Sequence, residues 1–153
     1  MTGFLIKIRK LELHWFVLLC LLCRIAIGLG VILLVNVSGT TPVMADFGDV
    51  GNVFYEFITV VLLAPLFETF LLQHLPFVWL EKRLRPAYII LLSSLVFSVL
   101  HHYNIGYMIS AFFVGMLYSG AYYLKREANP FLSVFIIHAG YNGFTFVWNN
   151  VYG

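Results

Sequence analysis

The chain has 153 residues, of which 61% are hydrophobic and only 10% are charged. Soluble domains average about 45–50% apolar and about 25% charged residues, so this composition excludes an ordinary soluble globular protein. The formal net charge of +2 is small and gives no indication of a nucleic-acid partner. The composition therefore predicts a single domain that lies in the lipid bilayer.

Five apolar segments are long enough to cross about 30 Å of hydrocarbon as helices, which takes roughly 20 residues. In chain order they lie near 13–35, 54–76, 87–103, 106–124 and 130–149. Strands of a membrane β-barrel would alternate apolar and polar residues, and runs such as YIILLSSLVFSVL do not. The predicted fold class is therefore all-α: a polytopic membrane protein with about five transmembrane helices.

The first apolar segment, 13–35, predicts a retained anchor helix. It is too long for a signal peptide, and VMA at 43–45 lies too far beyond it to serve as a cleavage site. Cys20 and Cys23 form a CxxC inside this segment, but redox and zinc motifs need water-accessible thiolates. We therefore interpret both cysteines as small apolar fillers. The polar stretch that follows, 36–53, predicts an outer loop.

The basic residues indicate an orientation in the membrane. Eight of the nine fall on one side of a five-span arrangement: Lys7, Arg9, Lys10, Lys82, Arg83, Arg85, Lys125 and Arg126. The loop 36–53, on the other side, contains Asp46 and Asp49 and no base. Because basic loops stay in the cytoplasm, the N-terminus is predicted to be cytoplasmic in a multi-pass plasma-membrane protein.

Ionisable side chains within predicted spans are functional candidates, because each costs about 2.5–3.5 kcal/mol to insert. They are Arg24, Glu68, His101, His102 and His138. Glu68, His101 and His138 lie 14, 16 and 12 residues from the nearest basic loop. At about 1.5 Å per residue, these separations correspond to roughly 18–24 Å. Three helices are therefore predicted to bring a carboxylate and two imidazoles to one level, nearer the outer face.

Local spacing supports a shared site. His138 and Asn142 are four residues apart and lie on one helix face, as do Phe97 and His101. Pro65, three residues before the glutamate, can bend its helix and free a backbone carbonyl. Small residues also recur at spacing four, which favours close packing of membrane helices: Ala26 and Gly30, then Ala111, Gly115 and Ser119, then Ala139 and Gly143.

Three chemistries fit one glutamate and two histidines in a small wet cavity. In hydrolysis, Glu68 and His101 would hold and deprotonate a water while His138 and Asn142 donate hydrogen bonds to the oxyanion. Two His and one Glu are also a known zinc set with an open fourth position. Proton or ion translocation is the third, although it calls for polar groups through the whole bilayer rather than at one level.

The order of these residues resembles the CPBP (Abi, CAAX protease and bacteriocin-processing) intramembrane proteases. The family pattern is EExxxR, FxxxH and HxxxN or HxxxD on successive core helices. Its counterparts here are Glu68-Thr69-x-x-x-Gln73, Phe97-x-x-x-His101 and His138-x-x-x-Asn142. The resemblance covers roughly 60–150. It implies a four-helix catalytic core over 54–153, preceded by an anchor helix and outer loop over 1–53.

The resemblance also implies an activity, a glutamic-type endopeptidase that needs no metal or other cofactor. Glu68 would activate the water with His101 as its partner, and His138 and Asn142 would form the oxyanion hole. Nothing in the sequence resembles HExxH, and zinc stays the alternative. The short chain resembles compact bacterial members that remove a C-terminal membrane-anchored sorting tag. The expected partner is therefore a membrane-anchored protein substrate in a bacterial inner membrane, rather than a prenylated protein.

Two positions depart from the family pattern, because Thr69 stands for the second Glu and Gln73 for the Arg. Thr and Gln keep hydrogen-bonding capacity and lose both charges. Replacing a buried ion pair by a neutral pair can cost little, so activity is still expected. The alternative is a decayed site in an immunity or chaperone-like membrane protein.

Three further polar residues lie outside the family pattern. Arg24 lies roughly 21 Å beyond the N-terminal basic residues, in the layer of Glu68. It could pair with Glu68, hold an acidic group or carboxylate of a substrate, or reach a lipid headgroup. His102 points about 100° away from His101 on the same helix, so one of the two is expected to be a bystander or interfacial. The resemblance to the FxxxH motif selects His101 as the site residue. His74 has no assigned role.

Overall fold

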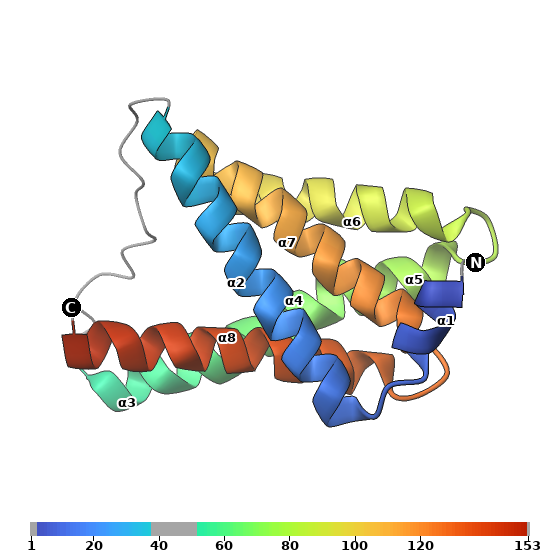
Figure 1. The fold of residues 1–153 in the computed structure, drawn as a ribbon, viewed down its shortest axis with the longest axis horizontal. Coiled ribbons are helices and arrows are strands. Elements are labelled where there is room, and N and C mark those ends of the chain that lie inside the picture. Colours follow the sequence, from blue (N-terminus) through green and yellow to red (C-terminus); the bar gives the residue numbers. More distant parts are fainter. Residues whose placement is uncertain (1–2, 38–51, 153) are drawn as a thin grey trace.

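The computed structural model of the chain describes residues 3–37 and 52–152, and these contain helices and no strand. Their bounds are α1 (Gly3–Arg9), α2 (Leu13–Val37), α3 (Val53–Glu56), η1 (Phe57–Leu63), α4 (Ala64–Thr69), η2 (Phe70–His74), α5 (Leu75–Leu80), α6 (Pro86–Leu100), α7 (Ile105–Leu124) and α8 (Pro130–Tyr152) (Figure 1). The all-α class is confirmed. Most of the predicted outer loop, including both aspartates and VMA, lies outside the described residues.

Four helical stretches are long and apolar enough to cross a membrane: Leu13–Leu34, Val53–Leu80, Ile105–Leu124 and Pro130–Tyr152. The prediction of a fifth full span over 87–103 is wrong in length. α6 has 15 residues, or about 22 Å, because His101 leaves the helical conformation at φ −103° and ψ 42°. Three residues later Asn104 caps α7 by accepting a hydrogen bond from the backbone N–H of Tyr107. The protein is thus polytopic, and residues 3–37 and 52–152 provide four helical stretches of spanning length and the shorter apolar helix α6.

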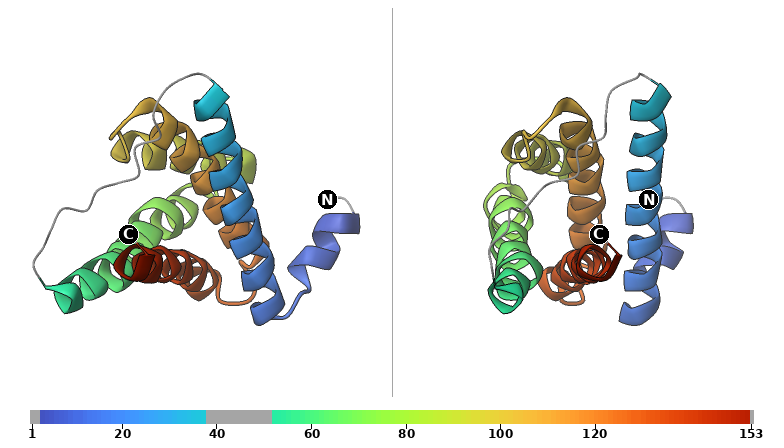
Figure 2. Two further views of the ribbon diagram at one scale, coloured as in Figure 1. Left: turned by 60° about the vertical axis from the view of Figure 1, so that its left-hand side comes forward. Right: turned by 90° about the vertical axis from the view of Figure 1, so that its left-hand side faces the viewer.

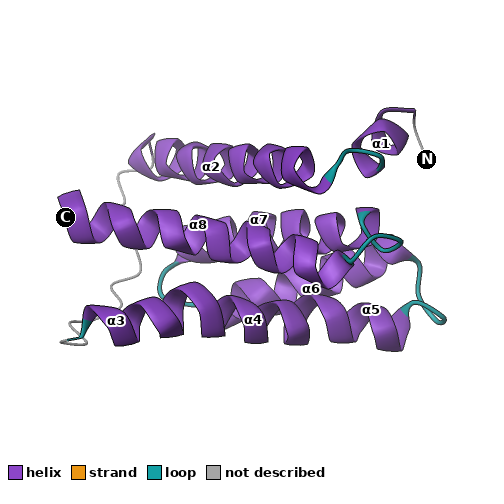
Figure 3. Ribbon diagram, turned by 90° about the horizontal axis from the view of Figure 1, so that it is seen from below, coloured by secondary structure: helices purple, strands orange, loops and turns teal. Residues whose placement is uncertain are grey.

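The helices pack with α7 and α8 between two outer elements. Figure 3 shows α2 on one side of α7 and α8, and α3 to α5 on the other. In Figure 2, α2 runs beside α7 along one edge of the molecule, and these two helices are in contact. In Figure 1, α1, the α5–α6 turn and the α7–α8 turn gather at one end. These are the basic segments, so the charge segregation is confirmed, while the orientation across the membrane stays a prediction.

α6 and α7 approach each other closely at Gly115. A Cβ atom on this glycine would lie 2.8 Å from Ser94 Cα and 3.2 Å from Phe97 Cβ. Ala111 and Ser119, one turn away on either side, are also buried. The small-residue spacing in α7 therefore reflects close helix packing. In α2 the same spacing does not, because a Cβ atom on Gly30 would meet nothing within 4 Å.

The stretch from α3 to α5 contains two π-helical segments, η1 and η2, and a proline follows two residues after each, Pro65 and Pro76. At the end of η1 the N–H of Ala64 bonds to the carbonyl of Thr59, five residues back. The next acceptor in that register is Val60, but Pro65 has no N–H to donate. The carbonyl of Val60 is therefore open to another donor, as the position of Pro65 in the sequence predicted.

Candidate active site

A cavity of about 310 Å³ lies inside the helical bundle. Its walls come from α2, η1, α4, α6, α7, α8 and the α6–α7 turn. The polar side chains that line it include Arg24, Glu68, His101, Tyr107, Tyr118, His138 and Asn142. All four predicted catalytic residues and the predicted substrate-binding arginine therefore face one space.

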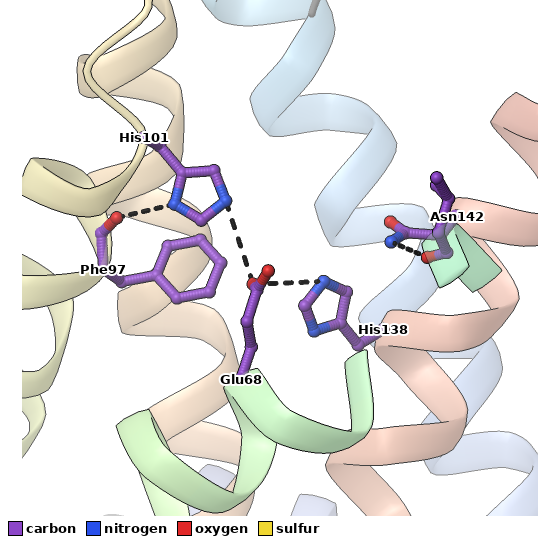
Figure 4. Close-up of polar contacts among 6 residues, drawn as sticks. Glu68, Phe97, His101, His138 and Asn142 are labelled. Carbon is purple, nitrogen blue, oxygen red and sulfur yellow. Dashed lines mark hydrogen bonds and ion pairs between the residues drawn. The ribbon is translucent and has the colours of Figure 1, made fainter. Parts of the chain in front are cut away.

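Glu68 lies between two imidazoles. It projects from α4, and its Oε2 atom is 3.8 Å from His101 Nε2 and 3.8 Å from His138 Nε2 (Figure 4). Oε2 is buried and makes no hydrogen bond within residues 3–37 and 52–152. Both separations exceed a direct hydrogen bond, and they suit a bridging water. The structure thus brings these three residues to one level, as their sequence positions predicted.

Phe97 fixes the orientation of His101. Nδ1 of His101 lies 2.7 Å from the Phe97 carbonyl oxygen, which can only accept a hydrogen bond. Nδ1 therefore carries the proton, and Nε2 of the neutral ring is an acceptor that faces Glu68. The Phe97 ring stacks on the imidazole with centroids 4.3 Å apart and planes 17° apart. The predicted supporting residue thus holds both the tautomer and the plane of the ring.

His138 and Asn142 line the cavity from successive turns of α8. His138 is buried, and its ring centre lies 4.7 Å from that of Tyr118. In the described part of the chain, its Nδ1 has no hydrogen-bond partner. Nδ2 of Asn142 donates to the freed carbonyl of Val60 at 2.9 Å (Figure 4). One amide hydrogen thus ties α8 to η1, and the same nitrogen carries a second hydrogen.

Thr69 and Gln73 are not brought into the cavity lining. Both side chains have an exposed fraction of 0%. Thr69 is the last residue of α4, and Gln73 is in η2, which packs against α6 and α7. In the part of the chain that the structure describes, neither side chain forms a hydrogen bond. Where the family pattern has charged groups, this chain therefore buries a neutral hydroxyl and amide.

The other two histidines in this region point elsewhere. Nδ1 of His74 makes a 2.7 Å hydrogen bond with the Tyr122 hydroxyl, in an aromatic cluster that includes Phe131. His102 is exposed in the α6–α7 turn, and its Nδ1 bonds to the carbonyl of Val99 near the end of α6. His101, rather than His102, therefore faces the cavity.

Arg24 reaches the cavity from α2, and its guanidinium stacks 3.8 Å from the centre of the Tyr141 ring. Among the described residues it forms no ion pair with Glu68, one of the pairings that the sequence allowed. Sequence reasoning missed Tyr141. Its position three residues after His138 puts it on the same face of α8, and this spacing could have revealed it.

The arrangement of donor side chains bears on the zinc alternative. Over residues 3–37 and 52–152, no group of three or more His, Cys, Asp or Glu side chains is placed to hold a metal ion. The independence from zinc and from other cofactors stays a prediction.

The fold and the cavity define an all-helical membrane protein with a glutamate and two histidines inside its helical bundle. Residues 50–144 match the family model described as type II CAAX prenyl endopeptidase Rce1-like. The match spans more than half of the chain, so the protein belongs to this family and is an intramembrane endopeptidase. Comparisons with curated proteins and with solved structures gave no match. α2, which carries Arg24, lies outside the matched residues.

Proposed function

We propose that this protease is of the glutamic type and cuts a membrane-anchored protein with Glu68 as the general base. The observation that carries the proposal is the carboxylate of Glu68, 3.8 Å from each of two imidazoles in a cavity inside the bundle. A water in this position can lose a proton to the carboxylate, and no further group is needed for that step.

In the proposed first step, the water donates one hydrogen to Glu68 and the other to Nε2 of His101. The second contact follows from the tautomer, because the Phe97 carbonyl keeps the His101 proton on Nδ1. The oxygen of the water then attacks the carbonyl carbon of the scissile bond while its proton moves to Glu68. Glu68 later passes this proton to the amide nitrogen as the C–N bond breaks.

The oxyanion of the tetrahedral intermediate needs donors on the other side of the substrate carbonyl. We assign this role to His138 and Asn142, which line the same cavity from one face of α8. Asn142 has a second amide hydrogen beyond the one that bonds to Val60. His138 would donate from Nε2, the ring nitrogen that lies 3.8 Å from Glu68 Oε2. Such prearranged donors are typically worth several kcal/mol in the transition state.

The proposed substrate is a protein with a C-terminal transmembrane sorting tag in a bacterial inner membrane. All four assigned residues lie within 54–153, which we propose as the catalytic core, with 1–53 as the anchor helix and outer loop. The site is 12 or more residues from each basic loop, which favours cleavage near the outer face if those loops are cytoplasmic.

The test compares membrane proteomes of the native host carrying the wild type, Glu68→Gln, His138→Ala or His102→Ala at equal abundance. We expect proteins with uncut C-terminal hydrophobic tags to accumulate with the first two variants. The exposed His102 lies outside the cavity, so its variant serves as a matched histidine control that processes normally. If no termini change while the variants stay folded and inserted, hydrolysis by Glu68 is refuted and a binding or translocation role replaces it.

A further inference from the structure

Arg24 places a permanent positive charge in the cavity without a carboxylate beside it. Within the described residues, the ion pairs of Glu68 are to His101 and His138, and none involves Arg24. The Nε atom of Arg24 is buried and has no hydrogen-bond partner among the residues that the structure describes. A guanidinium in such a low-dielectric space is costly unless an anion or several acceptors accompany it.

The surroundings of Arg24 hold the guanidinium without neutralising it. The Tyr141 ring covers one face at 3.8 Å, and Tyr118 lines the same cavity. Gly28, one turn along α2, leaves room beside it, since a Cβ there would lie 3.7 Å from a terminal nitrogen of Arg24. Stacking occupies the face of the guanidinium, so the in-plane N–H donors remain oriented for a planar anion.

We propose that Arg24 binds a carboxylate of the protein substrate and thereby selects substrates with an acidic group near the scissile bond. The inference rests on the proposed peptide hydrolysis at Glu68, whose cavity Arg24 shares. A carboxylate fits because its two oxygens accept two parallel N–H bonds from one guanidinium. The acid is either a side chain or the C-terminal carboxylate of the substrate.

The position of Arg24 makes it a specificity residue rather than part of the shared catalytic machinery. The assigned catalytic residues all fall within 50–144, the stretch that matches the family, whereas Arg24 is on the N-terminal α2. α2 packs against both α7 and α8, which carry Tyr118 and Tyr141. The N-terminal helix therefore contributes a recognition group to a cavity whose other walls belong to the core.

The experiment uses the full chain in phosphatidylcholine vesicles and a panel of fluorescent single-span peptides. Each peptide carries one Asp at a different position of its outer half, and a matched panel carries Asn. Free and amidated C-termini are compared for both panels. Binding is measured in the Glu68→Gln background with Arg24, Arg24→Gln or Arg24→Lys, and cleavage is measured separately with Glu68 intact. Arg83→Gln, an exposed arginine in the α5–α6 turn, controls for loss of charge.

We expect at least one acidic peptide to bind about tenfold tighter than its neutral match, as a charged hydrogen-bonded pair would give. The preference should vanish in Arg24→Gln, shrink in Arg24→Lys and persist in Arg83→Gln. A preference for Asp identifies a side chain as the ligand, and a preference for the free C-terminus identifies the terminal carboxylate. Melting temperatures of all variants control for folding.

The inference would be overturned if the protein that keeps Arg24 bound every acidic peptide and its neutral match equally. This comparison does not depend on whether an arginine variant folds. A preference that survives Arg24→Gln would also overturn it. Cleavage of acidic and neutral peptides with equal kcat/KM, together with equal binding, would leave hydrolysis standing and remove only the role of Arg24. Arg24-dependent binding without any cleavage would support the carboxylate site and refute the proposed hydrolysis.

Discussion

Gly115→Ala tests whether the close approach of α6 and α7 sustains the active-site geometry. The new methyl carbon would lie 2.8 Å from Ser94 Cα, roughly 0.6 Å inside an ordinary van der Waals contact. Its obstacle is backbone, which cannot rotate away, so α6 or α7 must shift. The methyl would also lie 3.2 Å from Phe97 Cβ. Because Phe97 orients His101 through its carbonyl and its ring, the shift is expected to reach the cavity.

The magnitude follows from two opposing effects. Replacing a glycine by alanine within a helix stabilises it by roughly 0.5–1 kcal/mol, whereas overpacking a close contact costs about 1–3 kcal/mol. Gly120→Ala, on the same helix, provides the matched control because its Cβ would meet nothing within 4 Å. The propensity gain is common to both variants, so their difference in stability isolates the packing cost of about 1–3 kcal/mol.

The assay is unfolding of the purified protein in mixed micelles with increasing dodecyl sulfate, followed by helical circular dichroism. We expect Gly120→Ala to be as stable as the wild type or more stable, and Gly115→Ala to unfold at lower denaturant. Cleavage of a single-span peptide should fall in Gly115→Ala and stay unchanged in Gly120→Ala. Equal unfolding of the two variants would refute the close contact, and normal cleavage by a destabilised Gly115→Ala would refute its link to Phe97.

Three further predictions concern two buried polar side chains and the metal dependence of cleavage. Gln73→Leu should keep or raise the unfolding midpoint, because the buried amide makes no hydrogen bond; a loss of more than about 1 kcal/mol would contradict this. Lys125→Met should lower stability by about 1–3 kcal/mol, since its Nζ donates to the carbonyls of Arg9 and Leu11, whereas the exposed Lys82→Met should be neutral. Treatment with 1,10-phenanthroline should leave peptide cleavage unchanged, because the proposed base is Glu68; inactivation that added zinc reverses would establish metal catalysis instead.

Much of the site could be predicted from residue spacing alone. Glu68, His101 and His138 are ionisable groups in apolar segments, and their distances from the basic loops placed them at one level. The rise of a helix is regular, so counting residues converts directly into depth in the membrane. The i, i+4 relation of Phe97 and His101 is equally local, and the ring stacking and carbonyl contact confirm it.

Other features depend on how the helices are rotated against each other. Sequence spacing placed Arg24 in the correct layer but could not choose between Glu68, the lipid headgroups and the Tyr141 ring. Thr69 follows Glu68 directly, yet its side chain is buried outside the cavity lining because successive helical residues point about 100° apart. The wrong length of the third span has a local cause, since apolar residues continue past the point where the chain turns at His101.

Hydrophobicity, charge and spacing were enough to define an all-helical membrane protein with a glutamate and two histidines at one depth, because these properties act residue by residue along the chain. Only the tertiary structure shows that Asn142 takes the Val60 carbonyl left open by Pro65. Only it shows that α2 delivers an arginine to the cavity that contains Glu68. Asn142 and Val60 are 82 residues apart in the sequence, and Arg24 of α2 reaches a cavity whose other walls come from later helices. Both arrangements depend on contacts between helices that are distant in the sequence, and no local pattern encodes such contacts.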